Sequence, residues 1–367
     1  APPATAFQVT AQQLEEANYD QDEFLESTEV DLPTTDAPPA TAFQVTAQQL
    51  EEAKAWHAAQ GHPRGKTALE MARHAIDGPS LEAVVQVARE CDACLLMRRI
   101  RQPDKSAKPR RNYPLQGRHG QRWRGDFLGQ QHQKDPTSRG YVDALVMRDV
   151  TSRAPLVWLV KTKDATSIIR SLQKMQAKMG EHRMLQLRFD QEFHSAALEE
   201  YCLTQNPPID LQFSAPYEPQ SNGVAEALVR DIKTLGRCVL HQSGLSEDFR
   251  DFAWQWAAAK LFKQSSAVLP DRASPWDVWP ECPFYHQDLI TAPFGCRVVV
   301  RTANRPALDR TTGQRGTSAV FLGYSEKSNA YVCWNYDQDE FLESTEVDFF
   351  PIHFCARSAA RRRKTAS

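Results

Sequence analysis

The chain has 367 residues, of which 41% are hydrophobic and 25% charged, and its formal net charge is −2, a composition typical of a globular protein with two or three domains. No apolar run approaches the roughly 20 residues of a membrane-spanning helix, and the first residues lack the basic and apolar pattern of a signal peptide. We therefore expect no membrane partner and a reducing compartment, where the eight cysteines are thiols or metal ligands and not a disulfide framework.

The N-terminal stretch is acidic and contains repeated text. Residues 1–53 hold eleven Asp or Glu and no Lys or Arg; residues 1–17 recur unchanged at 37–53, and residues 18–31 recur at 335–348. Solenoid repeats diverge and recur at a fixed spacing, so these identical, irregularly placed copies indicate a recent duplication or a gene-model junction. We expect residues 1–36 to be surplus and disordered, with a short helix from Thr46 into Trp56.

The next segment carries the spacing of a metal site. His57 and His62 form H-x4-H, and Cys91 and Cys94 form C-x2-C. Two imidazoles and two thiolates satisfy tetrahedral Zn²⁺, and a domain of about fifty residues needs such support because its own core is small. The alternative is a helix surface on which two histidines fall by chance, and His74 is a spare histidine outside the set.

A basic, proline-interrupted stretch follows. Residues 95–125 contain ten Lys or Arg and the single acid Asp104. We interpret residues 105–118 as a solvated linker that also contacts nucleic-acid phosphates, with Arg110 and Arg111 as candidates.

From residue 119 the pattern predicts strands and helices in the order of an α/β fold. The β-rich runs at 123–128, 141–148, 155–161, 184–189 and 210–213 are separated by helical patterns at 166–178 and 196–202, and a further helix begins at Ser221 or Asn222. That order is typical of a mixed sheet flanked by helices, as in the ribonuclease-H-like fold. Another amphipathic helix is expected at 247–262.

The helix after Asn222 has two faces. Leu228, Ile232, Leu235 and Val239 form a buried stripe, while Glu226, Arg230, Lys233 and Arg237 recur on another face. A carboxylate followed by cations suits a metal ligand on a helix that continues along a polyanion. Taken alone, the pattern favours a surface helix with a Glu226–Arg230 pair.

Two aspartates at strand ends favour the metal-ligand interpretation of Glu226 over the surface-helix interpretation. Asp126 and Asp190 follow apolar strands, and 35 residues separate Asp190 from Glu226. This arrangement, with SAPYEPQSNGVAE around Glu226, resembles the Asp-Asp-Glu triad of integrases, specifically those of copia-type retrotransposons. The resemblance covers roughly residues 56–350, and the His/Cys set resembles the integrase zinc module. The turn after Asp190 is two residues shorter than the family pattern, and Ala227 replaces its arginine.

The resemblance implies a metal-dependent DNA integrase that processes 3′ ends and transfers strands, with Asp126, Asp190 and Glu226 holding two Mg²⁺ or Mn²⁺ ions. It also implies structural Zn²⁺, element-end and target DNA, a homo-multimer, and a nuclear location reached from a cytoplasmic particle. Tyr217, Gln220 and Asn222 would help to hold DNA ends, although a purely structural turn explains them as well. Arg230, Lys233 and Arg237 would contact DNA. Asp149, in a segment similar to the family's D-x-x-S-R, is expected to form a turn.

Beyond the catalytic region, short alternating β segments predict a small barrel-like domain. The expected organisation is an acidic extension at 1–53, a zinc module at 54–104, a linker at 105–118, a catalytic core at 119–285, a small β domain at 290–351 and a basic tail at 352–367. The basic cluster at 361–364 is a weak nuclear-localisation pattern.

Three alternatives stay open. The chain could be an inactive integrase relic that only binds DNA, a different nuclease of the same fold, or a zinc adaptor that binds proteins. Metal-dependent cleavage of a DNA end separates the first from an active enzyme, the zinc module and PQSNGVAE argue against the second, and weak salt-dependent DNA affinity would mark the third.

Overall fold

The computed structural model describes residues 8–9, 43–63, 65–75, 78–97, 117–129, 136–214, 222–285, 292–301, 316–325 and 327–354. The chain divides into two compact units, Ala1–Asn112 and Tyr113–Ser367. No helix in the described ranges combines the length and apolarity needed to cross a bilayer. Predictions for most of residues 1–36, for most of the basic linker, and for Arg110, Arg111, Tyr217, Gln220 and the cluster at 361–364 fall outside the described residues.

The first unit is a small helical module. Strands β1 (Gln8–Val9) and β2 (Phe43–Gln44) pair antiparallel, and the helices are α2 (Ala47–Ala59), α3 (Gly65–His74), α4 (Leu81–Glu90) and α5 (Asp92–Met97). The predicted helix from Thr46 is present, because the Thr46 and Gln49 side chains form a capping box. The buried core cluster consists of Ala53, Ala68, Ala72, Ala83, Val84 and Val87, and the larger side chains of Leu50, Trp56 and Leu81 pack against it while only partly buried. Such a core buries little apolar area, so the module needs a further source of stability.

The second unit contains the predicted mixed sheet, which has five strands: β3 (Arg122–Phe127), β4 (Asp143–Asp149), β5 (Pro155–Val160), β6 (Gln186–Phe189) and β7 (Asp210–Phe213). The strand order is β5-β4-β3-β6-β7. Pairs β5–β4 and β4–β3 are antiparallel, whereas β3–β6 and β6–β7 are parallel. This topology confirms the predicted ribonuclease-H-like core.

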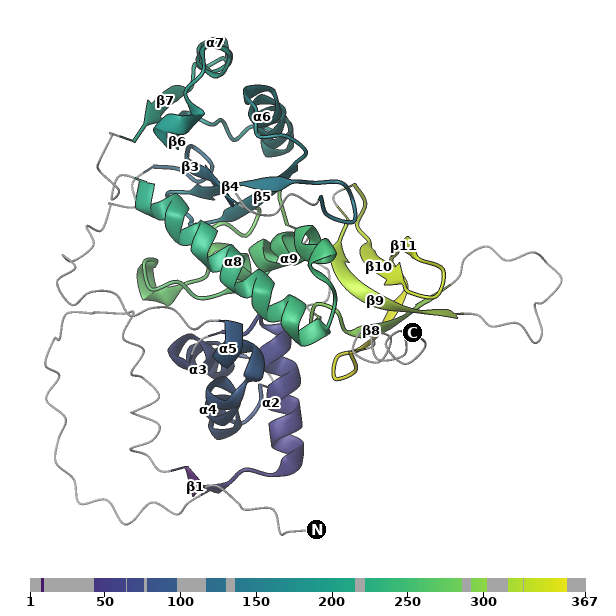
Figure 1. Cartoon of the computed structure of the whole chain (residues 1–367). Coiled ribbons are helices and arrows are strands. Elements are labelled where there is room, and N and C mark those ends of the chain that lie inside the picture. The colour runs from purple at the N-terminus through teal and green to yellow at the C-terminus, as the bar shows by residue number, and fades with distance from the viewer. Residues whose placement is uncertain are drawn as a thin grey trace, which may run out of the picture. The chain divides into compact units, whose positions relative to one another are not determined.

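Helices cover both faces of this sheet (Figure 1), and alternation along β4 explains why. Leu145 and Met147 pack with α6 (Ala165–Met179) and α7 (Ala196–Leu203), while Ala144 and Val146 pack with α8 (Gly223–Ser243) and α9 (Arg250–Lys263). A strand buried on both faces must be apolar on both, and β4 is almost fully buried. Shorter helical turns complete the unit: η1 (Gln191–Phe193), η3 (Glu247–Phe249), η4 (Pro270–Arg272) and α10 (Pro275–Val278).

The predicted start of one helix, at residue 247, is too early. The helix predicted at 247–262 begins with the 3₁₀ turn η3, and α9 starts only at Arg250. The Phe249 amide donates to the Ser246 carbonyl at 3.1 Å, which closes the tighter turn. Periodicity could not separate the two, because the apolar spacing continues through both.

The small β domain is also present. It is an antiparallel sheet of β8 (Arg297–Arg301), β9 (Gly316–Tyr324), β10 (Tyr331–Asn335), β11 (Glu340–Ser344) and β12 (Val347–Phe350), in the order β11-β10-β9-β8-β12. Its aromatic side chains pack on η3 and α9: Phe341 lies 5.3 Å from Phe252 and Trp334 lies 4.8 Å from Phe249, between ring centroids. The sheet therefore shares a hydrophobic core with α8 and α9.

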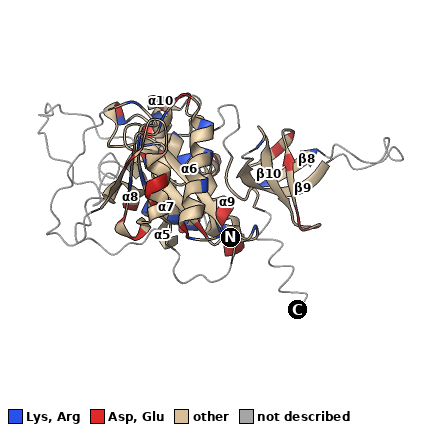
Figure 2. Cartoon of the chain, turned by 90° about the horizontal axis from the view of Figure 1, so that it is seen from above, with Lys and Arg blue, Asp and Glu red and all other residues tan. Residues whose placement is uncertain are grey.

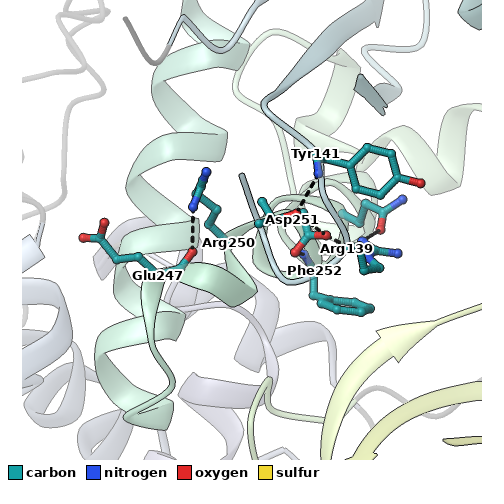
Figure 3. Close-up of polar contacts among 8 residues, drawn as sticks. Arg139, Tyr141, Glu247, Arg250, Asp251 and Phe252 are labelled. Carbon is teal, nitrogen blue, oxygen red and sulfur yellow. Dashed lines mark hydrogen bonds and ion pairs between the residues drawn. The ribbon is translucent and has the colours of Figure 1, made fainter. Parts of the chain in front are cut away.

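A buried ion pair fastens α9 to the segment before β4 (Figure 3). Arg139 Nε donates to Asp251 at 2.6 Å, its guanidinium lies 3.7 Å from the centre of the Phe252 ring, and its terminal nitrogen donates to Gln255 at 2.9 Å. Asp251 is fully buried and also accepts from the Thr137 hydroxyl. The carboxylate is therefore tolerated in the interior only because a cation and hydrogen-bond donors surround it.

Replacing Arg139 with methionine is expected to destabilise the second unit by about 3 kcal/mol, because a buried carboxylate loses its cation. Urea unfolding followed by tryptophan fluorescence measures this, since every tryptophan except Trp56 lies in that unit. The matched control is Arg301→Met: Arg301 pairs with Glu346 at the same 2.6 Å, but both side chains are more than half exposed, so the loss should stay below about 1 kcal/mol. Equal losses in the two variants would contradict this account.

Candidate functional site

The predicted zinc ligands come together in the first unit. His57 lies in the last turn of α2, and the chain then reverses at Gly61 and His62, which both have positive φ, so the His62 ring meets the His57 ring edge to face at 4.9 Å. Cys91 ends α4 and Cys94 lies in α5. One ligand atom from each of the four residues lies within 4.8 Å of the others.

The spacings within this set fit zinc. His57 Nε2 lies 3.4 Å from Cys94 Sγ, and His62 Nδ1 lies 3.4 Å from Cys91 Sγ and 3.7 Å from Cys94 Sγ. Bond lengths of about 2.0 to 2.3 Å imply edges of roughly 3.3 to 3.8 Å in a tetrahedron. The Cys94 side chain, and to a lesser extent the two histidines, lower the pKa of Cys91, which favours the thiolate that a metal requires.

The register between β3 and β6 indicates that Asp126 and Asp190 lie opposite each other. On the parallel pair β3 and β6, Arg122 lies opposite Gln186 and Arg124 opposite Arg188, so the same offset sets Asp126 opposite Asp190, directly after β6. Gly125 allows β3 and the Phe189 side chain of β6 to lie this close together, because a Cβ atom at position 125 would lie 2.2 Å from the Phe189 ring. Two carboxylates from distant parts of the sequence thus project from neighbouring strands at one edge of the sheet.

Asn222 ties the start of α8 to the same strand. Its side-chain amide donates to the Gly125 carbonyl at 3.3 Å, and the residue is 1% exposed. Asn222 is the N-cap residue of α8, one of the two predicted helix starts, but its side chain makes no capping hydrogen bond and its amide serves as a tether instead. Glu226, one turn into α8 and exposed, is thereby held beside β3; the DNA contact of Asn222 stays a prediction.

The pKa of Asp126 is shifted by burial and by the neighbouring carboxylates. Burial, followed by the negative charge of Asp190 and smaller contributions from Glu192 and Glu226, raises the pKa of Asp126 to about 7. Its oxygen accepts from the Phe127 amide at 2.7 Å, which partly opposes the shift. A buried carboxylate surrounded by further negative charge is the environment that a divalent cation neutralises, so the residues present fit such ions. Among the described residues, the His/Cys quartet is the group whose ligand atoms lie close enough together to hold a metal ion.

This pKa shift predicts a pH dependence of stability in the metal-free chain. A carboxyl group whose pKa rises from 3.8 unfolded to about 7 folded stabilises the fold while protonated, and this contribution is lost as pH rises from about 4 to 7. The melting temperature should therefore fall between pH 5 and pH 8, and Asp126→Asn should flatten the decline. Asp210→Asn, an exposed carboxylate on β7, is the control; an unchanged decline in Asp126→Asn would refute the assignment.

The shortened turn after Asp190 still folds compactly. Residues Gln191–Phe193 form η1, and the Phe193 ring stacks on Phe189 at 4.7 Å and on Phe127 at 5.0 Å. Two missing residues therefore do not displace Asp190 from the sheet edge. The same turn brings Glu192 close enough to influence Asp126, a contact that the sequence pattern did not single out.

Cations lie next to this edge. Lys163 Nζ pairs with the fully buried Asp143 at 2.5 Å and lies 5.4 Å from the Phe127 ring centre. Burial lowers the pKa of Lys233, against the opposing charges of Asp143 and Asp126, so Lys233 also lies near both acids. Arg230 and Arg237 are exposed on α8, the helix that carries Lys233. Charges of both signs are interspersed over the helices of the second unit (Figure 2). Lys163 carried no sequence signal, because it follows a strand end in an ordinary turn.

Asp149 has the predicted turn role. It accepts hydrogen bonds from the Ser152 amide and hydroxyl, each at 2.7 Å, and from the Gly120 amide at 3.2 Å. These donors hold the turn between β4 and β5, where the carboxylate is fully buried.

Comparison with known proteins agrees with the copia-type resemblance. The chain is 26% identical over 300 residues to the retrovirus-related Pol polyprotein of transposon TNT 1-94 from Nicotiana tabacum, covering 80% of this chain and 21% of that protein. It is 23% identical over 301 residues to the corresponding polyprotein of transposon RE2 from Arabidopsis thaliana, covering 80% and 19%. Homologues of the chain are therefore retrovirus-related Pol polyproteins of plant copia-like transposons.

The chain spans about a fifth of the length of these Pol relatives. The family model described as "Retroviral polymerase SH3-like domain" matches residues 296–360, which include the small antiparallel sheet. Among solved structures, a chain from the simian T-cell lymphotropic virus intasome in complex with PP2A regulatory subunit B56 gamma aligns with a TM-score of 0.41 and 16% identity, covering 81% of this chain and 98% of that chain.

Proposed function

We propose that the chain is the integrase segment of a retrotransposon Pol polyprotein and catalyses metal-dependent 3′-end processing and strand transfer of DNA. The observation that carries the proposal is the alignment of Asp126 with Asp190 across β3 and β6, beside the tethered start of α8. Asp126, Asp190 and Glu226 would hold two Mg²⁺ or Mn²⁺ ions, and the His/Cys quartet would hold a structural Zn²⁺. When bound, the two hard cations would neutralise phosphate charge and activate the attacking oxygen.

The chain's own residues have distinct roles in this proposal. Strands β3 and β6 would set the positions of Asp126 and Asp190. Glu226 lies on α8, and the hydrogen bond from Asn222 to Gly125 would hold the start of that helix in place. Lys233 beside Asp126 supplies a positive charge for the DNA backbone, and exposed Arg230 and Arg237 extend that line along α8. Element ends and target DNA would be the substrates, a homo-multimer the working form, and the nucleus, reached from a cytoplasmic particle, the place of action.

A branched DNA duplex that mimics the joined product tests this function, because the reverse of strand transfer on such a substrate needs no particular element terminus. With Mn²⁺ or Mg²⁺ the purified chain should resolve the branch, and without divalent ions it should not. A chain that binds the duplex with strong salt dependence but leaves it uncut under all metal conditions would instead be the DNA-binding relic. The turn after Asp190, which is two residues shorter than the family pattern, is the observation that supports the DNA-binding relic as a second candidate.

Loss of the tether should weaken catalysis without removing any metal ligand. Asn222→Ala is expected to lower the rate of branch resolution about tenfold, because the start of α8 and with it Glu226 would lose their attachment to Gly125. Gln173→Ala, at an exposed position on α6, serves as the control and should retain full activity. Full activity in Asn222→Ala would show that the tether does not position Glu226.

A further inference from the structure

A cavity of about 120 Å³ lies within the second unit, away from the carboxylates. Its walls come from β5, α6, α9, the segment that follows α10, and the end of β9. Aromatic side chains dominate these walls: Trp158, Phe252, Trp256, Phe284, Tyr285 and Tyr324. The lining residues all belong to the described part of the chain; none is acidic, and three are lysines: Lys178, Lys260 and Lys263.

Lys260 is the unusual member of this wall. Phe252, Trp256 and Lys260 follow one another at intervals of four along α9, so the lysine occupies a position on the buried face. Lys260 is 2% exposed, and within the described ranges it makes no hydrogen bond or ion pair; its amine lies 5.1 Å from the centre of the Trp256 ring. A lysine so deeply buried is almost always paired, and this one borders empty space instead.

We propose that this cavity binds a small planar organic anion, the size of one aromatic ring, with Lys260 as its counter-charge. A cavity of roughly 150 Å³ accommodates benzene in a protein interior, so this space suits a single ring. The aromatic walls contact the ring, and the anionic group meets an amine that lacks a carboxylate partner among the described residues. A neutral ring of the same shape gains the wall contacts but not the ion pair.

The charge state of Lys260 links such binding to protons. Burial, with a smaller contribution from the positive charge of Lys263, holds the pKa of Lys260 well below its ordinary value. An anion beside the amine would favour its charged form and so raise this pKa, which couples binding to proton uptake. The other titratable groups facing the space are Lys178 and Lys263, together with the phenols of Tyr285 and Tyr324. Burial raises the pKa of both phenols, so they stay neutral near pH 7.

Calorimetric titration of the full chain with benzoate and with the neutral isostere benzamide tests the proposal. We expect benzoate to bind at least about tenfold more tightly than benzamide at pH 6. Benzoate affinity should weaken by up to about tenfold per pH unit toward pH 8, with proton uptake measurable from the dependence of heat on buffer. Equal affinities for the two ligands, or no binding of either, would overturn the proposal.

Two variants separate the ion pair from general effects. Lys260→Met keeps the volume of the side chain and removes a buried polar group, so it should fold at least as stably and lose the preference for benzoate. Lys174→Met, on the exposed face of α6, should bind benzoate as the unmodified chain does. Undiminished benzoate binding by Lys260→Met would rule out Lys260 as the counter-charge. DNA branch resolution is unaffected by either outcome, so this test stands apart from the proposed catalytic function.

Discussion

Asp190→Asn is expected to reduce metal-dependent DNA strand transfer by at least about a thousandfold. The substitution keeps the size of the side chain and removes its charge, so the fold and the register of β6 against β3 should survive. Metal ions contribute several kcal/mol of charge stabilisation in the transition state, and about 4 kcal/mol corresponds to a thousandfold in rate. Single-turnover resolution of the branched duplex in Mn²⁺ measures the effect.

The control for this experiment is Asp210→Asn. Asp210 begins β7 on the same sheet, is exposed, and accepts from the Gln186 and Gln212 side chains. Its loss should leave the rate within about twofold of the unmodified chain. Strand transfer that persists in Asp190→Asn would remove this carboxylate from the catalytic assignment.

The second large effect is expected at the His/Cys quartet. Cys91→Ala should abolish zinc binding and unfold the segment from α2 to α5, because the module has a small core, built mainly of alanine and valine, and would depend on the metal for its stability. Structural zinc sites in small domains contribute about 10 to 16 kcal/mol of apparent binding free energy. Hydrogen exchange across residues 47–97 of the full chain, with parallel metal analysis, measures the loss of structure.

His74→Gln is the matched control, since His74 is an exposed histidine of α3 outside the quartet. It should retain one equivalent of zinc and unchanged exchange protection, while removal of zinc by a chelator should reproduce the effect of Cys91→Ala. Full protection in metal-free Cys91→Ala would show that the helices fold without the metal.

Much of the catalytic core could be predicted from sequence, because its signals are local. Alternation and β-branched residues marked the five strands, and the apolar stripe from Leu228 to Val239 marked α8. The positions of Asp126 and Asp190 directly at strand ends suggested their proximity, since parallel neighbours end at the same edge. The spacing of His57, His62, Cys91 and Cys94 likewise carried the metal site.

The remaining features depend on contacts between distant segments. Asn222 reads as a helix cap, yet its amide reaches Gly125, 97 residues earlier. The buried pair of Arg139 and Asp251 joins residues that are 112 positions apart, and neither lies in a motif. Lys260 falls on an apolar helix face where composition alone predicts a hydrophobic residue. No local periodicity encodes these pairings, because tertiary packing selects them.

The most direct test of the account is a crystal of the chain grown with Mn²⁺ and analysed by anomalous diffraction. We expect manganese peaks between Asp126 and Asp190, with Glu226 turned toward them from α8. Crystals saturated with Mn²⁺ that show no peak at Asp126 and Asp190 would contradict the claim that these acids form one divalent-metal site.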